Sequence, residues 1–410
     1  MWMSTVCIVF LVLLFLVYAY IRNKFKFWAL QPVFHVYDFG YYLFPPGILL
    51  HELPEPNKYC NFKNIETIPF SKLNDFKIQK CLQFIQRHYL RNRGNIFSPS
   101  KQHFQPYFVG HNTESYFSFY TQDEWLLDIK TNEGVEHNKI IAVMTGRPLH
   151  VYMGDRDTKN ELDVYYVDYL CVDSTHRKNG IAPQVIQTHE YNQRRANKNI
   201  QVSLFKREGE LTGIVPLCVY KTCLYTLQDT VSSWMPLSNH IDWIQVGPQN
   251  AVHLIDFMRD QTSRFSVVGV VETGNLMELI KTQNIYCTIL KEEHDVLAAY
   301  FFRKSCTYIG GKDEVLTCFA SILKQEQKTR KKRNKEKELQ QLFLQGFQES
   351  VLKIKKDHPQ FQFTVIENIS DNDILIRMLS YEPMMTSPTA YFFYNFAYPT
   401  FPAKEVLMIH

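Results

Sequence analysis

Apolar residues recur at helical spacing in four stretches of the chain, residues 75–89, 183–197, 249–259 and 339–356. In the first stretch, the apolar positions are Ile78, Cys81, Leu82, Ile85 and Tyr89. Apolar residues that lie three or four positions apart share one face of a helix. The pattern therefore predicts four amphipathic helices, each with one face turned toward a core.

Shorter runs rich in Val, Ile, Tyr and Phe lie between these helices and are typical of strands. They occupy residues 115–120, 125–130, 140–144, 163–172, 285–290, 296–303, 361–366, 391–398 and 406–409, with strand and loop over 203–225. Residues 46–75 have no clear period and predict a long surface loop. Helices and strands alternate, so we expect a mixed α+β fold. Its central sheets would be mixed or antiparallel and flanked by helices.

The first 22 residues depart from this pattern. Residues 1–21 contain no charged side chain and are long enough to cross a bilayer as one helix. A cleaved signal peptide or a buried core helix is the alternative, but neither a basic start nor a small-residue cleavage site is evident. We expect a single-pass membrane anchor over residues 1–22. Arg22, Lys24 and Lys26 follow the span, which predicts that the body faces the cytosol.

Composition narrows the class of protein. The 410 residues are 45% hydrophobic and 21% charged, with a net charge of +4. This charge is too small and too dispersed to favour a nucleic-acid partner. Nine cysteines, an odd number without a CxxC pair, predict reduced thiols, with neither disulfides nor a zinc site. We expect no metal, and we expect a monomer.

The order of elements in residues 23–231 returns in weaker form in residues 232–410, which predicts two similar halves. Within the second half, residues 324–337 form a dense basic run. A solvated helix or loop is the simpler interpretation of that run. Attraction to anionic lipid is the alternative.

The segment Arg177-Lys178-Asn179-Gly180-Ile181-Ala182 follows a predicted strand and precedes a predicted helix. The first backbone N–H groups of a helix have no partner within it, so they can bind an anion together with the helix dipole. Glycine permits a tight turn and close approach of a ligand to the backbone. This loop resembles the pyrophosphate-binding loop of the GNAT acyltransferase superfamily, which holds coenzyme A.

A narrower resemblance covers nearly the whole body. DYLCVDSTHRKNGIAP, residues 168–183, resembles the signature of the glycylpeptide N-myristoyltransferase (N-tetradecanoyltransferase) family. Three more segments resemble motifs of that family in the same order: FKFWALQPV (25–33), GIVPLCVYKTCLY (213–225) and YFFYNFAYPTFPAKEVLMIH (391–410). The resemblance implies two GNAT-like halves related by a pseudo-twofold axis. The first half would bind myristoyl-CoA, and the second would contribute to binding proteins with an N-terminal glycine.

Site residues follow from the matched motifs. The resemblance implies that Lys26, Phe27 and Trp28 line the acyl-CoA site, and that the N–H groups of Tyr169 and Leu170 form an oxyanion hole. Pantetheine and phosphates would be held by Cys171, Val172, Arg177, Lys178, Asn179, Gly180, Ile181 and Ala182. The catalytic base would be at His410, where either the terminal carboxylate or the imidazole could take the proton of the glycine amine.

Three positions depart from the family pattern. Asp168 stands where the family has Asn, and Leu211 stands where a Thr is expected, with Thr212 adjacent. Residues 89–93 are basic where the family is acidic. Two further functions therefore stay open: a GNAT-type enzyme that uses a shorter acyl-CoA, and a non-catalytic protein that binds acyl-CoA or peptide.

Overall fold

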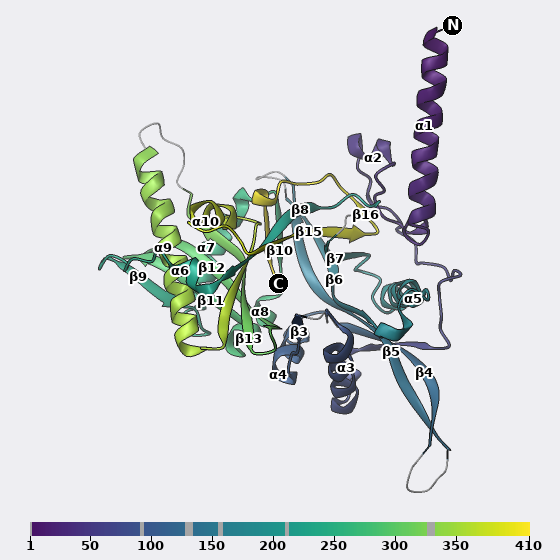
Figure 1. Ribbon diagram of the computed structural model, residues 1–410, viewed down its shortest axis with the longest axis horizontal. Helices are drawn as coiled ribbons and strands as arrows, with labels where there is room; N and C mark the ends of the chain where they lie inside the picture. Colours follow the sequence, from purple (N-terminus) through teal and green to yellow (C-terminus); the bar gives the residue numbers. More distant parts are fainter. Residues whose placement is uncertain (1, 91–93, 128–133, 155–158, 210–212, 326–332) are drawn as a thin grey trace.

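The computed structural model describes residues 2–410 except 91–93, 128–133, 155–158, 210–212 and 326–332. Helix α1 (Trp2–Lys24) projects from a body made of a large mixed sheet and its covering helices (Figure 1). The mixed α+β fold predicted from the sequence is confirmed. Of the features expected from the sequence, most of the basic run and Arg91, Arg93, Leu211 and Thr212 lie outside the described residues.

Fifteen strands of the described residues form one sheet. They are β2 (Ile65–Pro69), β3 (Asn95–Phe97), β4 (Tyr116–Leu127), β5 (Gly134–Met153), β6 (Asn160–Val172), β7 (Val202–Glu208), β8 (Cys218–Thr226), β9 (Ile241–Gln245), β10 (Val267–Val270), β11 (Ile285–Glu292), β12 (Asp295–Ile309), β13 (Asp313–Leu323), β14 (Phe361–Glu367), β15 (Met385–Tyr394) and β17 (Val406–Ile409). The main path runs β17-β10-β5-β6-β7-β15-β8-β14-β13-β12-β11-β9. A separate short ladder joins β1 (Gly47–Ile48) to β16 (Phe396–Ala397).

Helices α3 (Asp75–His88) and α5 (Ile181–Ala196) cover opposite faces of β4, β5 and β6. The predicted apolar face of α3 packs against Phe117, Phe119, Val143 and Cys171. Ile181 and Val185 of α5 pack against Ala142 and Met144. Val143 and its two neighbours in β5 thus point to opposite sides, as the alternation of a strand requires.

The remaining helices cover the part of the sheet formed by β8 to β14. Two clusters of buried apolar residues lie there, one of them on the inner face of α9 (Arg333–Asp357), which lies across this end of the molecule (Figure 1). The other helices here are α6 (Leu227–Val231), α7 (Ala251–Gln261), α8 (Thr273–Lys281) and α10 (Asn372–Met378). Smaller helices elsewhere are α2 (Phe39–Leu43) and α4 (Lys101–Phe104).

The C-terminal part of the chain contributes strands to the N-terminal part. Strand β15 lies between β7 and β8, pairing Phe392 with Phe205 and Ala390 with Val219. Strand β10 is antiparallel to β5 and parallel to β17, which brings the end of the chain to the centre of the body. Residues before and after position 231 therefore share one sheet.

Two local expectations were wrong. The loop expected over 46–75 contains β2, which pairs with β4 and is buried at Ile65. The single strand expected over 391–398 is broken at Asn395, whose φ of +63° ends β15. The Asn395 side chain bonds the main chain at Leu50 and Gln201, and this tertiary contact offsets the cost of the left-handed backbone.

Candidate active site

The candidate site lies where two parallel strands separate. Strands β6 and β7 pair from Val164–Val202 to Val167–Phe205. Beyond that point β6 continues against β5 only, and β7 continues against β15 only. A cavity of about 330 Å³ occupies this opening.

Most of the cavity wall is apolar. It is lined by Trp28, Tyr89, Met144, Val167, Asp168, Leu170, Ile186, Glu190, Ser203, Phe205, Lys206, Arg207, Ile214 and Tyr394. The Trp28 ring stacks on Phe205 with 5.6 Å between centroids. Apolar and aromatic walls with a few polar groups are typical of small-molecule sites, and these walls suit an aliphatic chain.

One polar group in the wall has an unusual environment. Glu190 is 5% exposed, and its Oε2 accepts a hydrogen bond of 3.4 Å from Ser203 Oγ. Its Oε1 is buried without a hydrogen-bond partner in the part of the chain that the structure describes. Burial raises the pKa of this carboxyl to about 7, although Arg194 and Ser203 oppose the rise. The cavity therefore has one wall residue that can carry a proton near neutral pH.

Strand β6 offers a backbone donor to the opening. Asp173 N donates to Ile141 O at 2.9 Å, so these opposite residues form a hydrogen-bonded pair. Along an antiparallel ladder, hydrogen-bonded pairs alternate with pairs that are not hydrogen-bonded. Leu170 and Met144, three pairs further on, therefore form a pair without mutual hydrogen bonds. The Leu170 N–H then points away from β5, toward the side where β7 diverges. The Tyr169 N–H points the other way and donates to Thr145 Oγ1 at 3.2 Å. Of the two predicted oxyanion donors, Leu170 is the one turned to the cavity.

The loop before α5 is open to solvent and shaped for a helix N-terminus. Gly180 has φ +73° and immediately precedes α5, and Lys178 also has a positive φ of +68°. Residues 177–180 are exposed. The first amides of α5, at Ile181 and Ala182, thus adjoin solvent at the positive end of the helix dipole.

Arg177 is held in place by main-chain carbonyl groups. Its Nη2 donates to His88 O at 2.6 Å, and its Nε donates to Val172 O at 3.4 Å. These two bonds tie the arginine to the ends of α3 and β6. Lys178 and Asn179 remain exposed, while Cys171 is buried against α3.

The N-terminal motif is split by the structure. Trp28 lines the cavity, and Phe27 contacts both Trp28 and Tyr59 edge to face, at 5.0 and 5.1 Å. Lys26 is exposed and lies outside the cavity lining. His35 Nε2 lies 2.9 Å from the main-chain oxygen of Trp28 and fixes the turn that presents the indole.

His410 is buried at the centre of the body, 1% exposed, at the end of β17. Arg303 Nη2 donates to its main-chain oxygen at 2.7 Å. Its ring lies 3.4 Å from Arg147 Nη2 through Nδ1 and 3.0 Å from Tyr391 Oη through Nε2. Burial and the nearby Arg303 and Arg147 lower the pKa of this imidazole well below its usual range, so it is neutral.

Arg147 connects the cavity to His410. Its Nε donates to both oxygens of Asp168, at 3.1 and 2.8 Å, and Asp168 lines the cavity. A second buried pair lies nearby, because Glu367 accepts from Lys206 Nζ at 2.8 Å and from Tyr220 Oη at 2.6 Å. Burial works against ionisation of Glu367, but Lys206 and Arg303 outweigh it and lower the pKa of this carboxyl.

Arg147, Lys206, Arg303 and Glu367 were not among the site residues predicted from the sequence. The signal was available as arginines within apolar strands, TGRPLHV around Arg147 and YFFRKSC around Arg303. A charged side chain in such a run is buried only with a partner. The partners lie far away in the sequence, and the sheet topology brings them together.

Three side chains elsewhere have the composition of a metal site. The ligand atoms of His150, Glu161 and Asp163 lie within 4.8 Å of one another. His150 Nδ1 lies 2.6 Å from Asp163, and its Nε2 lies 2.9 Å from Glu272. Hydrogen bonds to carboxylates account for both nitrogens of the ring, so this group is explained without an ion.

Part of the chain matches a family model, and the fold matches solved structures. Residues 58–218, which hold the separating strands and the loop before α5, match the model of the "Myristoyl-CoA:protein N-myristoyltransferase, N-terminal domain" family. The fold matches a Saccharomyces cerevisiae N-myristoyltransferase with bound myristoyl-CoA at TM-score 0.69 and 13% identity, over 93% of this chain and 90% of that chain. The chain thus resembles the N-myristoyltransferase family in the sequence of residues 58–218 and in its fold.

Two more solved structures share the fold. A second structure of the Saccharomyces cerevisiae N-myristoyltransferase with bound myristoyl-CoA has TM-score 0.68 and 12% identity, over 92% of this chain and 94% of that chain. A tandem GNAT protein from the clavulanic acid biosynthesis pathway has TM-score 0.52 and 9% identity, over 82% of this chain and 100% of that chain. At these identities the likeness concerns the fold. No curated protein matches the sequence.

Among the residues predicted for the N-myristoyltransferase site, two separate groups emerge. Trp28 and Leu170 line the cavity, and the residues from Arg177 to Ala182 surround the start of α5. His410 lies beyond Asp168 and Arg147, outside the cavity lining. Leu211, Thr212, Arg91 and Arg93 lie outside the described residues.

Proposed function

We propose that this protein transfers the tetradecanoyl group of myristoyl-CoA to the N-terminal glycine amine of proteins. The observation that carries the proposal is the apolar cavity between β6 and β7, with the Leu170 N–H turned toward it and the start of α5 open beside it. The cavity would take the acyl chain, the Leu170 N–H would bind the thioester carbonyl, and the start of α5 would bind a phosphate group.

The chemistry requires little from side chains. The neutral glycine amine attacks the thioester carbonyl, a C–N bond forms, and the C–S bond breaks to release the coenzyme A thiol. A backbone donor stabilises the oxyanion that develops on the carbonyl. The amine proton goes to a base, and the released thiolate takes up a proton in turn.

We assign the base to the main-chain carboxylate of His410, which requires that the chain end at this residue. Arg147 offers only N–H groups, so His410 Nδ1 is the acceptor and Nε2 carries the ring proton toward Tyr391 Oη. Neither ring nitrogen has a lone pair left for an amine. Mass spectrometry of the C-terminal peptide from the purified protein establishes whether the carboxylate is free.

A shorter acyl donor is the second candidate, and Glu190 favours it. A carboxyl with an unpaired oxygen in the cavity wall is a costly neighbour for a methyl terminus. Under this alternative, the acyl group of the donor is short enough to end before it reaches Glu190.

The test is transfer to a peptide that begins with glycine, incubated with equimolar acetyl-, octanoyl- and myristoyl-CoA and followed by mass spectrometry. The same peptide with an acetylated N-terminus is the matched control. Exclusive myristoylation of the free amine supports the proposal. Exclusive transfer of a shorter chain supports the second candidate, and binding of acyl-CoA without transfer contradicts both.

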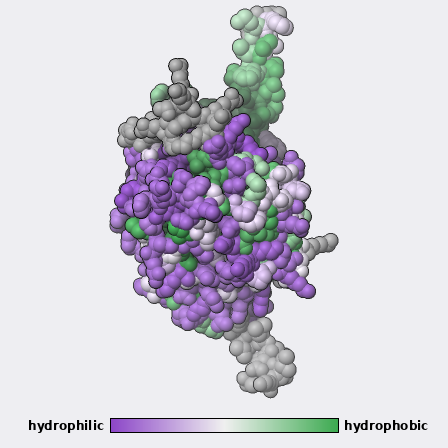
Figure 2. Space-filling view, turned by 90° about the vertical axis from the view of Figure 1, so that its left-hand side faces the viewer, coloured by the Kyte–Doolittle hydropathy of each residue, from purple (hydrophilic) through white to green (hydrophobic). Residues whose placement is uncertain are grey.

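We also propose that α1 spans a membrane with the body on the cytosolic side. Within Thr5–Lys24, an 18-residue window has a mean hydropathy of 2.4, and none of this window is buried against the body. In Figure 2 the helix stands clear of the largely hydrophilic surface. Arg22 and Lys24 in its last turn favour the cytosolic side for the body. Digestion of the body by protease added outside intact cells, or protection of the body from protease added to sealed microsomes, would contradict this topology.

A further inference from the structure

Helix α2 presents an apolar surface to solvent beside α1. Phe39 is 70% exposed, Tyr42 47%, Leu43 76% and Phe44 81%. We call these four side chains the α2 wedge. Four large apolar side chains exposed within six consecutive residues are unusual on the surface of a soluble protein and mark an interaction site.

The wedge is fixed to the body. Phe34, 2% exposed, contacts the rings of Tyr41 and Tyr42 at 5.7 and 4.8 Å. Asp38 precedes α2, and its carboxylate accepts a hydrogen bond of 2.8 Å from His35 N. The exposed rings therefore belong to an ordered element with a defined direction.

The end of α1 is fixed to the same part of the body. Tyr18 contacts Tyr37 edge to face, with 5.0 Å between centroids. A Cβ on Gly213 would lie 3.0 Å from Ile21 and 3.3 Å from Phe25, so α1 ends in close contact with this loop. No linker separates the helix from the body, and Trp28 of the cavity wall follows four residues after α1 ends.

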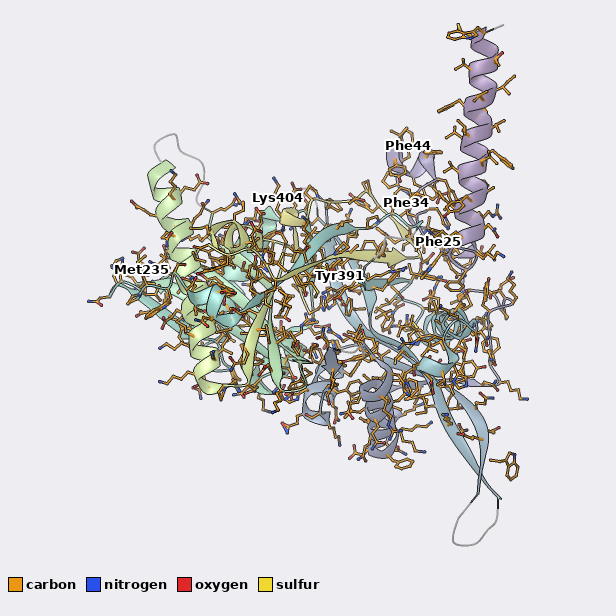
Figure 3. All side chains as sticks on the ribbon, viewed as in Figure 1. Phe25, Phe34, Phe44, Met235, Tyr391 and Lys404 are labelled. Carbon is orange, nitrogen blue, oxygen red and sulfur yellow. The ribbon has the colours of Figure 1, made fainter. Side chains whose placement is uncertain are left out.

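These contacts set the level of the wedge relative to a bilayer. Tyr18 lies three residues before Ile21, the last apolar residue of the span, a rise of about 4.5 Å along a helix. Tyr37, which contacts Tyr18 and adjoins α2, is thus at the height of the last turn of the span. Tyrosine and tryptophan concentrate at this level of a membrane, where the ring is apolar and the hydroxyl is wet. Figures 1 and 3 show α2 and Phe44 on the same side of the body as α1, with Phe25 at the foot of the helix.

We infer that the α2 wedge enters the bilayer surface beside α1 and holds the Trp28 wall of the cavity close to the membrane. The occupant of this surface is lipid, because the wedge lies on the same side of the body as α1 (Figure 1), and α1 has the length and composition of a span. This inference rests on the proposed spanning role of α1. It adds a second, laterally displaced contact, which fixes the tilt of the body instead of leaving it tethered at one point.

The consequence concerns the substrates. Trp28 and Ile214 of the cavity wall lie within a few residues of Phe25 and Gly213, at the foot of α1. A docked body keeps this wall next to the interface, where long-chain acyl groups partition. The acyl donor and the acylated product then need only a short path between the cavity and the lipid.

The experiment uses the full chain in phosphatidylcholine nanodiscs that contain lipid with a nitroxide near the top of the acyl chain. The background is Cys7→Ser with Cys60→Ser, because the other seven cysteines are buried. A bimane label is placed at Phe44→Cys, and Leu43→Cys provides a second position on the wedge. Phe76→Cys, on α3 and 64% exposed in the wild type, is the matched control far from α1. The native Cys7 in α1, restored in a fourth variant, reports on the span.

We expect the nitroxide to quench most of the fluorescence at positions 44 and 43 and at Cys7, and to leave position 76 nearly unchanged. Quenching at Cys7 without quenching at 43 and 44 would overturn the docking and leave the span intact. Quenching at neither Cys7 nor the wedge would overturn both. Equal quenching at positions 44 and 76 would mean nonspecific adsorption and would also overturn the docking.

Discussion

Arg147 binds the carboxylate of Asp168 through its Nε, and the two charges lie between the acyl cavity and His410. The Arg147 side chain is 1% exposed and packs between the rings of Tyr107 and Tyr166, each centroid 5.4 Å from its guanidinium carbon. Asp168 is the residue that departs from the family signature. Its charge is neutralised by Arg147, so it does not confront the developing oxyanion as an isolated anion.

The pair predicts strong coupling between two substitutions. Asp168→Asn leaves Arg147 buried without a counter-ion, and we expect the free energy of unfolding to fall by about 3–5 kcal/mol. Arg147→Met should cost a similar amount. The double variant Arg147→Met with Asp168→Asn removes both charges and should cost less than either single change. Urea denaturation of the three variants measures the coupling, and additive losses would contradict it.

Glu190 predicts a pH dependence of stability. Its pKa of about 7 in the folded protein exceeds the ordinary value of 4.5, so the folded state retains a proton that the unfolded state has lost between these pH values. Stability therefore falls as pH rises from about 4.5 to 7 and stays lower above that range. A pKa difference of this size corresponds to roughly 3 kcal/mol.

The measurement is urea denaturation of wild type and Glu190→Gln at pH 5 and pH 8. The variant cannot ionise at this position, so it should gain stability relative to wild type at pH 8 and lose this advantage at pH 5. Glu55→Gln, at an exposed position, is the matched control. An advantage that is equal at both pH values would show that the Glu190 carboxyl is not responsible.

Local patterns predicted the elements that carry the site. The apolar spacing in α3 and the strand, loop and helix of residues 160–196 depend on neighbours in sequence, and all of them are confirmed. The oxyanion donors could be predicted only as a pair, because which N–H group faces the cavity depends on the register between β5 and β6. A bulge after Met144 sets that register, and nothing in the local pattern of β6 reveals it.

The buried charges illustrate what local patterns cannot give. Arg303 contacts His410, which is 107 positions away in the sequence, and Lys206 contacts Glu367, which is 161 positions away. These contacts exist because β15 inserts between β7 and β8 and because β17 pairs with β10. Strand order in a sheet depends on pairing between segments that are far apart in the sequence. The spacing of apolar residues along one helix or one strand therefore could not predict that these residues lie together.

The loop before α5 predicts a difference between two neighbouring substitutions. A Cβ on Gly180 would meet no atom within 4 Å, so its φ of +73° is the reason for glycine here. Gly180→Val must therefore rearrange the loop, at a cost of about 1–2 kcal/mol or more. We expect binding of myristoyl-CoA to weaken about tenfold. Lys178→Ala removes one exposed charge and should weaken binding much less.

Isothermal titration with myristoyl-CoA and with coenzyme A measures both effects. Gly180→Val should weaken binding of both ligands alike, because the proposed phosphate site is at this loop and the proposed acyl site is in the cavity. Small and equal losses for the two variants would mean that this loop does not hold phosphate. Circular dichroism of Gly180→Val guards against a general loss of folding.

The end of the chain gives the last prediction, because the two possible bases at His410 respond differently to two changes. Appending a few residues converts the terminal carboxylate into a peptide bond and overfills a site where His410 is 1% exposed. Transfer should fall by about 10²–10⁴-fold, the usual contribution of a positioned base. Binding of myristoyl-CoA should persist, since its cavity is lined by other residues.

His410→Gln keeps the carboxylate and its bond from Arg303 but removes the imidazole. Because both ring nitrogens are already engaged, we expect this variant to retain most of its activity in single-turnover transfer. A loss in His410→Gln as large as that in the extended protein would assign the base to the imidazole. Full activity in the extended protein would exclude His410 from proton transfer altogether.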